Sequence, residues 1–564
     1  MQKTETRTGA DLLADALKNL GVRRAFGVCA DQTNPLFVGL AKRGIEVIGT
    51  RNESGAIHMA DGAARATGEP CVAIAGGGPG HVASVPGIAV AQSAASPVLL
   101  ISGQPPLDLR ERNGHQILYQ ADIMRSLTKW SFEIVSPETL AEFAARGWRA
   151  ALAGKPGPVS LSIPINVLDA PIPNAGSGGP VDYRVKPLAR KAEMLNATVG
   201  DSIADACSLL AAAKKPLMIV GGGAWWELSQ AVLAAAVAKL EIPVFTLDQA
   251  RGQIPDDGES CFGYAHPSFN RTFRRIAEAD VVVIVGTEVF MHTGAAQKKL
   301  FHPNSRIIQL HSDERQIGIG RAADVAVIGP LEISLPQLVH MLKKEPQVAS
   351  AQKAWLREIR KSYRDHLKEW DNIHERHASG KGIHPIQLCR SLARYLNPDI
   401  RVVIDGGDFV HWPRLSFPAR GAGCWMDGAE LGMLGSSLPI GIGAQMGSPV
   451  EQTWVFIGDG GMNYYSWELA TAVQYKVPVK IIVGNDACWG VERRLQTKHY
   501  GMTVAVDLEE TRFDHFAQLV GAEGFRVERP EDLDAVVDAF VASAGPSVLD
   551  VRIPRDCGRP LLDN

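Results

Sequence analysis

Closely spaced cysteine pairs are missing from this sequence. Its eight cysteines are scattered over 564 residues, and none forms a Cys-x-x-Cys pair. A disulfide framework or a thiolate zinc site is therefore not expected, and this use of cysteine fits the reducing cytoplasm.

An excess of charge of one sign is also missing. The formal net charge is −3, so no basic face argues for nucleic acid as a partner. The longest apolar runs, such as VVVIVG at 281–286, have the length of a strand and are too short to span a membrane. The chain opens with a polar stretch and a helical pattern, which does not resemble a secretory leader. We expect a cytoplasmic protein that binds neither nucleic acid nor membrane.

The sequence does contain a repeated alternation of short apolar stretches with helical stretches. Such alternation predicts doubly wound parallel sheets, and the length suggests about three domains. We expect three α/β domains at 1–170, 188–345 and 375–556, with a linker rich in Pro and Gly at 170–187 and a charged helix around 353–370. The predicted strands lie at 24–28, 45–50, 71–77, 97–103 and 158–164, then at 216–223, 243–248, 280–286, 306–311 and 324–329, and finally at 400–407, 424–428, 453–460, 479–486 and 547–554.

Polar side chains stand at the ends of two predicted strands in the third set. Asp459 follows one strand and Asn485 closes the next. Open parallel sheets bind ligands at the carboxyl ends of their strands. One carboxylate, one amide oxygen and a backbone carbonyl there suit a Mg²⁺ ion that carries a diphosphate, which Gly460 and Gly461 would let the backbone approach. The same residues also fit a glycine-rich turn with a helix cap, and both interpretations stay open on composition alone.

The spacing between Gly458-Asp459-Gly460 and Asn485 resembles the cofactor motif of thiamine diphosphate-dependent enzymes. One departure is that Gly484 stands where relatives carry the first residue of an Asn-Asn pair. The resemblance implies a Mg²⁺ site made of Asp459, Asn485 and the carbonyl of Ala487, with Gly458, Gly460 and Gly461 against the diphosphate.

Residues 50–68 resemble the activating segment of that family, with Glu53 at the position of the catalytic glutamate. The resemblance implies that the carboxyl of Glu53 hydrogen-bonds N1′ of the cofactor's pyrimidine and so promotes loss of the thiazolium C2 proton. Glu53 also fits the first turn of a helix capped by Asn52, where a negative charge is favourable. Its occurrence together with the metal motif favours the catalytic interpretation.

Three further stretches resemble parts of the cofactor site. In 426–444, Gly432 matches the residue whose carbonyl accepts the cofactor's 4′-amino group, and Leu434 matches the residue that forces its bent shape. In 405–412, Gly407 and Asp408 stand where relatives carry Gly-Gln against the diphosphate, and we expect Asp408 to act through its backbone, through water or by ordering a loop. Trp489 follows the metal motif and is expected beside the cofactor.

Three more residues are candidates for catalytic residues that line the active site. His81 follows a Gly-Pro-Gly turn and would either move protons or form a polar wall. Gln120 lies in a stretch similar to the one that contains Phe-Gln-Glu in acetolactate synthases. Glu492, on a helix after the metal motif, is either a second acid/base or a solvated helix charge.

The middle domain resembles the part of the family that binds FAD in acetolactate synthases, ADP in oxalyl-CoA decarboxylase and 2-hydroxyacyl-CoA lyases, or nothing. A run of three glycines, 221–223, after a strand is weak evidence for a nucleotide. His311-Ser312-Asp313 also replaces the usual Asp-x-Asp. FAD, ADP and no ligand all stay open.

The resemblance implies a thiamine diphosphate- and Mg²⁺-dependent lyase or carboligase that makes or breaks a C–C bond next to a carbonyl. We expect decarboxylation or carboligation of a 2-oxoacid, as in acetolactate synthases. The alternative is a 2-hydroxyacyl-CoA lyase or oxalyl-CoA decarboxylase, although the last residues offer little basic character for coenzyme A. A silent cofactor-binding subunit is a third hypothesis, which the presence of Glu53 and Asp459 disfavours. The family's sites lie between subunits, which implies a homodimer or homotetramer.

Overall fold

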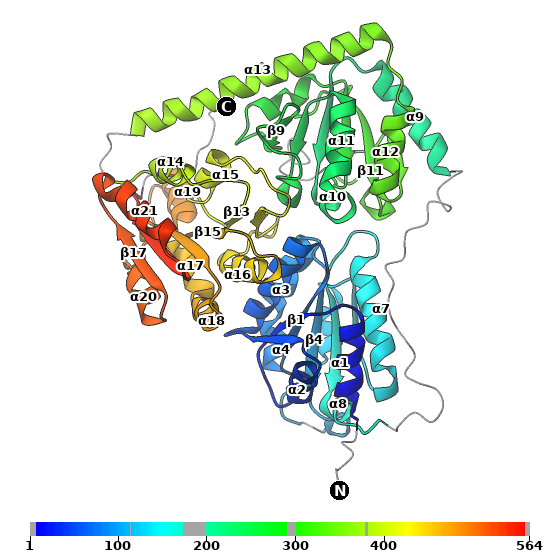
Figure 1. The fold of residues 1–564 in the computed structure, drawn as a ribbon, viewed down its shortest axis with the longest axis vertical. Coiled ribbons are helices and arrows are strands. Elements are labelled where there is room, and N and C mark those ends of the chain that lie inside the picture. The colour runs from blue at the N-terminus through cyan, green and yellow to red at the C-terminus, as the bar shows by residue number, and fades with distance from the viewer. Residues whose placement is uncertain are drawn as a thin grey trace.

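Three six-stranded sheets form the framework of the molecule (Figure 1). The computed structural model describes residues 7–112, 114–172, 198–289, 300–377, 382–555 and 557–558. Every strand pairing in these sheets is parallel, so the predicted α/β class with three doubly wound parallel sheets is confirmed. Most of the predicted linker and the first residues of the predicted middle domain, 173–197, lie outside the described residues.

The first sheet carries the segment of Glu53. Its strand order is β2 (Glu46–Gly49), β1 (Arg24–Gly27), β3 (Cys71–Ala75), β4 (Val98–Gln104), β6 (Val159–Pro164) and β5 (Trp130–Glu133). The helices are α1 (Gly9–Asn19), α2 (Asn34–Lys42), α3 (Glu53–Thr67), α4 (Pro79–Ala83), α5 (Val85–Ser93), α6 (Gln120–Arg125), α7 (Leu140–Leu152) and α8 (Ile165–Leu168). Helix α3 begins at a side-chain cap, because Asn52 accepts hydrogen bonds from the N–H groups of Ser54 and Gly55.

The second sheet has the order β12 (Val325–Ile328), β11 (Arg306–His311), β10 (Val281–Val285), β7 (Pro216–Val220), β8 (Val244–Thr246) and β9 (Cys261–Tyr264). It packs with α9 (Thr198–Ala212), α10 (Gly222–Glu227), α11 (Gln230–Leu240) and α12 (Leu331–Met341). The charged helix predicted around 353–370 is α13 (Pro346–His377), which runs from the second sheet towards the third (Figure 1). Its Trp355 lies in the core of the second domain and its Trp370 in the core of the third.

The third sheet carries the Asp459 turn. Its order is β14 (Trp425–Asp427), β13 (Ile400–Ile404), β15 (Gln452–Gly458), β16 (Val479–Asn485), β18 (Ser547–Arg552) and β17 (Glu523–Val527). The helices are α14 (Pro385–Ala393), α15 (His411–Ser416), α16 (Ser437–Gly447), α17 (Asp459–Tyr465), α18 (Glu468–Gln474), α19 (Gly490–Tyr500), α20 (Phe513–Leu519) and α21 (Leu533–Ala542). Every residue of β16 is buried, as expected for a central strand covered on both faces.

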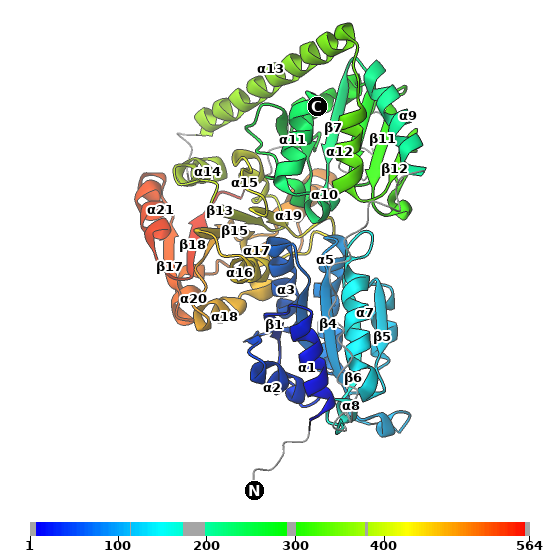
Figure 2. The same cartoon turned by 45° about the vertical axis from the view of Figure 1, so that its right-hand side comes forward.

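Helices α3 and α16 join the first and third domains, and they lie side by side in both ribbon views (Figure 2). The contact depends on glycines. A methyl group at Gly62 would collide with the carbonyl of Ile440, and one at Gly443 with the carbonyl of Met59. The backbones therefore touch without intervening side chains, and both helices contribute to one apolar core. Within the described residues, no helix combines the length and the apolar character needed to cross a membrane.

Candidate functional site

The carboxyl ends of three neighbouring strands, β13, β15 and β16, bring polar residues to one edge of the third sheet. Asp405 follows β13, Asp459 follows β15 and Asp486 follows β16. Because the strands are parallel, these three carboxylates come to the same edge. The sequence predicted this meeting point for Asp459, but it did not single out Asp405 or Asp486.

Asp459 and Asp486 form a carboxylate pair in which Asp459 is buried and Asp486 is half-buried. Asp459 is 6% exposed, and burial together with the charge of Asp486 raises its pKa to about 7. Burial likewise raises the pKa of Asp486, whose Oδ1 accepts the N–H of Cys488 at 3.2 Å. Two carboxylates held together out of water favour a cation between them. The pair therefore fits a divalent metal.

Asn485, the predicted partner of Asp459, is held through its amide nitrogen. Asn485 is fully buried, and its Nδ2 donates to the carbonyl of Thr511 at 2.9 Å and to Asp550 Oδ1 at 3.0 Å. Side chains alternate along a strand, so Asn485 and the next residue point to opposite faces. The amide oxygen of Asn485, the atom predicted to bind the metal, has no hydrogen-bond partner in the structure, and Asp459 and Asn485 directly follow the paired residues Gly458 and Gly484 of β15 and β16. Asn485 is therefore a candidate ligand together with Asp486.

The carbonyl of Ala487, the third predicted ligand, is also occupied. It accepts the N–H of Leu508 at 2.9 Å and Nη2 of Arg555 at 3.0 Å. No group of three or more His, Cys, Asp and Glu side chains suited to a metal occurs in the described part of the chain. A metal at the Asp459–Asp486 pair would thus take its other oxygens from the amide of Asn485, backbone, phosphate and water, as Mg²⁺ commonly does.

The glycine turn at 458–461 is packed on two sides and open on a third. A methyl group at Gly460 would collide with the indole ring of Trp489, and one at Gly461 with the carboxylate of Asp405. A methyl group at Gly458 would meet nothing within 4 Å. Trp489 and Asp405 therefore hold the turn in place, while its first residue, Gly458, stays accessible beside the carboxylate pair.

A cradle forms at the end of β13. Leu434 Cδ2 and the carbonyl oxygen of Gly432 lie 2.8 and 3.3 Å from the position of a Cβ at Gly406. Gly432 and Gly407 both have left-handed backbones, with φ of 63° and 106°, and no atom lies within 4 Å of a Cβ at either. The carbonyl and the side chain predicted to contact the cofactor therefore converge over one glycine, next to open space.

Two aspartates in the segment 405–408 hold the cradle in place. Asp405 accepts the N–H groups of Gly435 at 2.9 Å and Ser437 at 3.3 Å, and its burial raises its pKa to about 6. Asp408 accepts hydrogen bonds from Nε and Nη2 of Arg494, at 3.0 and 3.1 Å. The side chain of Asp408 thus links its loop to α19.

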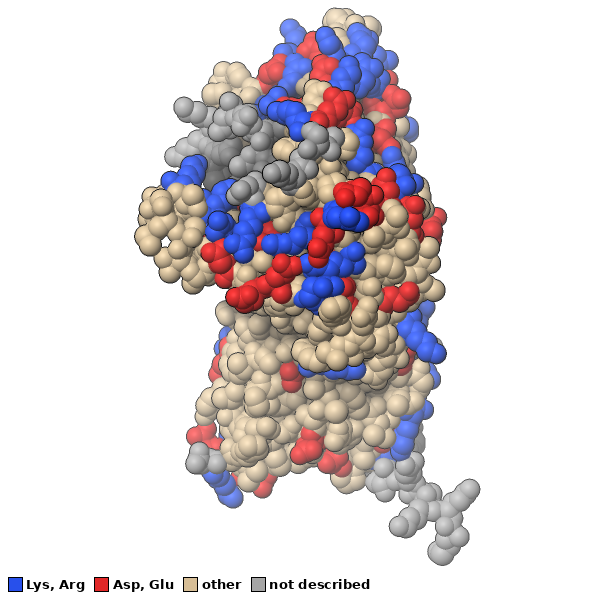
Figure 3. All heavy atoms as spheres, turned by 90° about the vertical axis from the view of Figure 1, so that its left-hand side faces the viewer, with Lys and Arg blue, Asp and Glu red and all other residues tan. Residues whose placement is uncertain are grey.

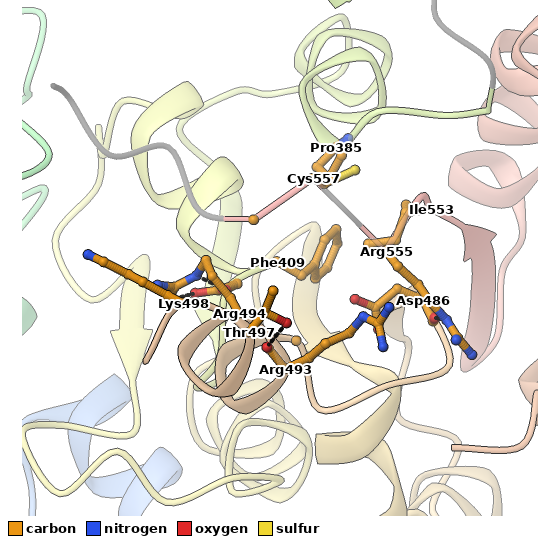
Figure 4. Close-up of a pocket in the computed structure, with 13 residues that line it drawn as sticks. Pro385, Phe409, Asp486, Arg493, Arg494, Thr497, Lys498, Ile553, Arg555 and Cys557 are labelled. Carbon is orange, nitrogen blue, oxygen red and sulfur yellow. Dashed lines mark hydrogen bonds and ion pairs between the residues drawn. The ribbon is translucent and has the colours of Figure 1, made fainter. Parts of the chain in front are cut away.

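A cavity of about 340 Å³ adjoins Asp486 (Figure 4). One face of α19 supplies Arg493, Arg494 and Lys498, and Arg555 comes from the opposite side. Asp486 and Phe409 also line it. We call it the arginine-lined cavity, and its charge suits a phosphate-bearing group.

In the first domain, Glu53 is the first residue of α3 and lies beside the turn at 78–81. A Cβ at Gly80 would be 2.9 Å from Oε1 of Glu53. The neighbouring residues anchor the segment to the third domain of the same chain: the N–H of Arg51 donates to both oxygens of Glu468, at 3.1 and 3.3 Å. Glu468 is buried, which raises its pKa to about 6. This anchoring role was not predicted from the sequence.

His81 and Gln120 are fully buried beneath the same turn. Nδ1 of His81 is 2.9 Å from the hydroxyl of Ser102, and Nε2 is 3.0 Å from the carbonyl of Gln120. The side-chain oxygen of Gln120 accepts the N–H of Gly78 at 2.9 Å, and its Nε2 donates to the carbonyl of Gly103 at 3.0 Å. Burial lowers the pKa of His81 to about 4. Both side chains thus have protein partners that fix the turn beside Glu53.

Glu492 lies on the outside of α19 and is exposed, and it is absent from the lining of the arginine-lined cavity. In the single chain it is a surface charge. The structure therefore does not bring it together with Glu53 or with the carboxylate pair.

Comparison with known proteins identifies the family of each domain. Three family models match: the N-terminal thiamine pyrophosphate-binding domain at residues 7–125, the central domain at 203–338 and the C-terminal thiamine pyrophosphate-binding domain at 405–551.

Full-length relatives also match. A probable 2-ketoarginine decarboxylase of Pseudomonas aeruginosa is 31% identical over 99% of this chain and 96% of its own length. The 2-hydroxyacyl-CoA lyase 2 of Bos taurus is 30% identical over 94% and 87%. A probable acetolactate synthase large subunit of Methanocaldococcus jannaschii is 27% identical over 97% and 92%. The chain belongs to the thiamine pyrophosphate enzyme family.

Proposed function

We propose that this protein decarboxylates a 2-oxoacid and then protonates the remaining acyl unit or joins it to a second carbonyl compound, as in acetolactate synthases. The observation that carries this proposal is the Asp459–Asp486 pair at the open edge of the third sheet, beside the cradle of Gly432 and Leu434. Relatives named for 2-oxoacid chemistry match over nearly the whole chain. We include in the proposal a cytoplasmic location and domain bounds of 1–170, 188–345 and 375–556.

Thiamine diphosphate, when bound, supplies a nucleophilic carbon and an electron sink for the substrate's carbonyl carbon. We propose that Asp459, Asp486 and the unpartnered amide oxygen of Asn485 would hold the Mg²⁺ that accompanies its diphosphate, with the carbonyl of Ala487 beside them. The carbonyl of Gly432 and the side chain of Leu434 orient the ring system. Trp489 covers the glycine turn and excludes water from it.

Glu53 is the proposed proton-holding group. Its carboxyl hydrogen-bonds the cofactor's pyrimidine and shares a proton with it. His81 and Gln120 act through position, because their buried hydrogen bonds fix the turn beside Glu53. Asp408 acts likewise, through its pair with Arg494. Glu492 reaches substrate only if a second subunit or a closing segment encloses α19.

We propose a homodimer or homotetramer in which Glu53 of one copy serves the Asp459 site of another. Large apolar side chains are exposed near the site: Tyr464 in the last turn of α17 is 51% exposed, Trp467 just before α18 is 59% exposed, and Leu431 in the cradle loop is 50% exposed. The lower part of the face in Figure 3, over the first domain, also carries few charged side chains. Such surfaces support burial against another copy.

A second candidate function is cleavage of a 2-hydroxyacyl-CoA. The arginine-lined cavity favours it, because it gathers the basic side chains Arg493, Arg494, Lys498 and Arg555 that a coenzyme A phosphate requires. Arg494 is paired with Asp408, and Arg493 and Arg555 are paired with Asp507, so a phosphate would compete with these carboxylates. The sequence alone had suggested that such character was scarce. Relatives named 2-hydroxyacyl-CoA lyase 2 match the chain over most of its length.

A proton NMR time course separates the two functions. Purified protein with thiamine diphosphate and Mg²⁺ receives pyruvate and related 2-oxoacids in one series and 2-hydroxyacyl-CoA thioesters in another. We expect carbon dioxide with an aldehyde or a carboligation product in the first. Formyl-CoA and a released carbonyl compound would establish the second candidate. If neither series gives a product although the cofactor is bound, both proposed functions are contradicted and a non-catalytic subunit is favoured.

A further inference from the structure

The loop that follows β16 is held through its backbone carbonyl groups. The carbonyl of Asn485 accepts a hydrogen bond from Nη1 of Arg552, the last residue of β18, at 3.1 Å. The next two carbonyls, those of Asp486 and Ala487, accept Nε and Nη2 of Arg555, each at 3.0 Å. Two arginines at and just beyond the end of β18 therefore engage three successive carbonyl groups beside the proposed metal site.

The guanidinium of Arg555 also reaches the segment on the other side of this loop. Its Nη1 donates to Oδ1 of Asp507 at 3.1 Å. Asp507 forms an antiparallel β-bridge with Cys488, and the N–H of Leu508 donates to the carbonyl of Ala487 at 2.9 Å. Because a guanidinium is a rigid, planar fork of donors, one side chain fixes the loop and the bridging segment in a single geometry (Figure 4).

Ala487 needs such a constraint. Its backbone is left-handed, with φ of 53°, and its side chain is 2% exposed. A residue with a Cβ is strained in this region and stays there only where its surroundings determine the conformation. The donors on its carbonyl, from Leu508 and Arg555, supply that determination.

The turn at Ala487 sets the direction of the Asp486 carboxylate. The N–H of Cys488, the residue after the turn, donates to Oδ1 of Asp486 at 3.2 Å. Oδ2 of Asp486 lies 3.3 Å from the position of a Cβ at Gly490, at the start of α19. A changed backbone at Ala487 would move the N–H of Cys488 and release the carboxylate from its place beside Asp459.

We propose that Arg555 is a positioning residue for the divalent metal. Its hydrogen bonds to the carbonyls of Asp486 and Ala487 hold the carboxylate of Asp486 towards Asp459, so that it acts through the backbone of the loop. This inference rests on the proposed metal site at the Asp459–Asp486 pair.

The direction of the effect separates positioning from charge. Arg555 is a cation beside a cation site, so the loss of its charge alone would strengthen metal binding. The loss of a residue that orients a metal ligand acts in the opposite direction and typically weakens binding about 10- to 100-fold. We expect Arg555→Ala to bind Mn²⁺ about tenfold more weakly than the wild type in the presence of thiamine diphosphate, as measured from the electron paramagnetic resonance signal of the free ion.

Arg493→Ala is the matched charge control. Arg493 lines the same cavity and also pairs with Asp507, at 2.9 Å, but within the described residues its guanidinium donates no hydrogen bond to the carbonyls of 485–487. Its loss should leave the affinity for Mn²⁺ unchanged or slightly raised. The thermal unfolding midpoints of both variants, measured without metal, control for folding.

Arg555→Lys is a second variant, which keeps the charge. A single ammonium cannot serve two carbonyls and Asp507 at the same time, so the affinity for Mn²⁺ should lie between those of the wild type and Arg555→Ala. Wild-type affinity in Arg555→Lys would mean that charge alone matters and would overturn the proposal.

Two further results would overturn the proposal while leaving the metal site intact. One is unchanged or tighter Mn²⁺ binding by a folded Arg555→Ala protein, and the other is an equal loss of affinity in Arg493→Ala. If the wild type itself binds no Mn²⁺ in the presence of thiamine diphosphate, the proposed metal site is wrong and the role of Arg555 is overturned with it.

Discussion

At the scale of single residues, two neighbours at the end of β16 have opposite environments. Asp486 faces Asp459, whereas Asn485 donates to Thr511 and Asp550. We predict that Asp486→Asn weakens Mn²⁺ binding in the presence of thiamine diphosphate about tenfold or more, because a half-buried negative charge is lost. The affinity for Mn²⁺ is measured from the electron paramagnetic resonance signal of the free ion.

Asn485→Ala is the companion variant. It should also weaken Mn²⁺ binding, because the unpartnered amide oxygen is removed, and it should lower the free energy of unfolding by about 1–3 kcal/mol, because the buried carboxylate of Asp550 loses a donor. Unchanged Mn²⁺ affinity in Asn485→Ala would remove Asn485 from the ligand set, and unchanged affinity in Asp486→Asn would remove Asp486.

His81 makes the free energy of unfolding depend on pH, and the direction of this dependence follows from its pKa. Burial holds its pKa at about 4 in the folded chain, below the ordinary 6.5, so between these values the unfolded chain binds the extra proton. The stabilising contribution is complete above pH 6.5 and is lost as the pH falls, by about 1.4 kcal/mol per pH unit. We predict that His81→Gln has a flatter decline in urea-unfolding free energy from pH 6.5 to 5 than the wild type.

The comparison with His81→Gln isolates this histidine, because buried acids such as Asp405 and Glu468, with raised pKa values, act in the opposite direction at low pH. Parallel curves for variant and wild type would mean that His81 is protonated in the folded state. That result would make His81 a candidate for proton transfer during catalysis.

Local spacing explains which residues were predictable. Glu53, Asp459 and Gly432 stand in short motifs whose spacing is visible in the chain, and the structure places Glu53 and Asp459 at the starts of helices and Gly432 in the loop between β14 and α16. Glu468 was not recognised as an anchor, because its partner Arg51 is 417 positions away. Asp486 was missed because a single step along a strand decides the face to which a side chain points.

At the scale of elements, the contact between α3 and α16 rests on missing side chains. We predict that Gly443→Ala lowers the midpoint of urea unfolding, with a loss of about 1–3 kcal/mol, because the added methyl meets the backbone of Met59. Gly200→Ala in α9 is the control: nothing lies within 4 Å of its Cβ, and a helical alanine should be neutral or slightly stabilising. Equal effects of the two changes would contradict the close packing.

Each of the three strands that the sequence did not predict, β5, β9 and β17, lies at an edge of its sheet. Central strands such as β10 are continuous runs of buried apolar residues and are easily recognised. Edge strands pair on one side only and tolerate polar residues or glycine, as in Trp130–Glu133 and Glu523–Val527. Their patterns therefore resemble loops.

At the scale of the whole molecule, the proposed active site is shared between two copies of the chain. We predict that Glu53→Gln and Asp459→Asn proteins, each inactive alone, regain about a quarter of the wild-type activity after subunits are mixed and exchanged. Half of the randomly formed dimers would then contain one intact site of two. A mixture that stays inactive after proven exchange would place Glu53 and Asp459 of the same chain in one site.

The most direct test of the central claim needs no knowledge of the substrate. Thiamine diphosphate bound with Mg²⁺ is placed in D₂O, the reaction is quenched with acid, and loss of the C2 proton signal is followed by NMR. We predict rapid exchange with the wild type and exchange at least about 100-fold slower with Glu53→Gln, at unchanged cofactor affinity, because Glu53 governs proton removal. Equal exchange rates in the two proteins would contradict the assignment of Glu53 and the catalytic site built on it.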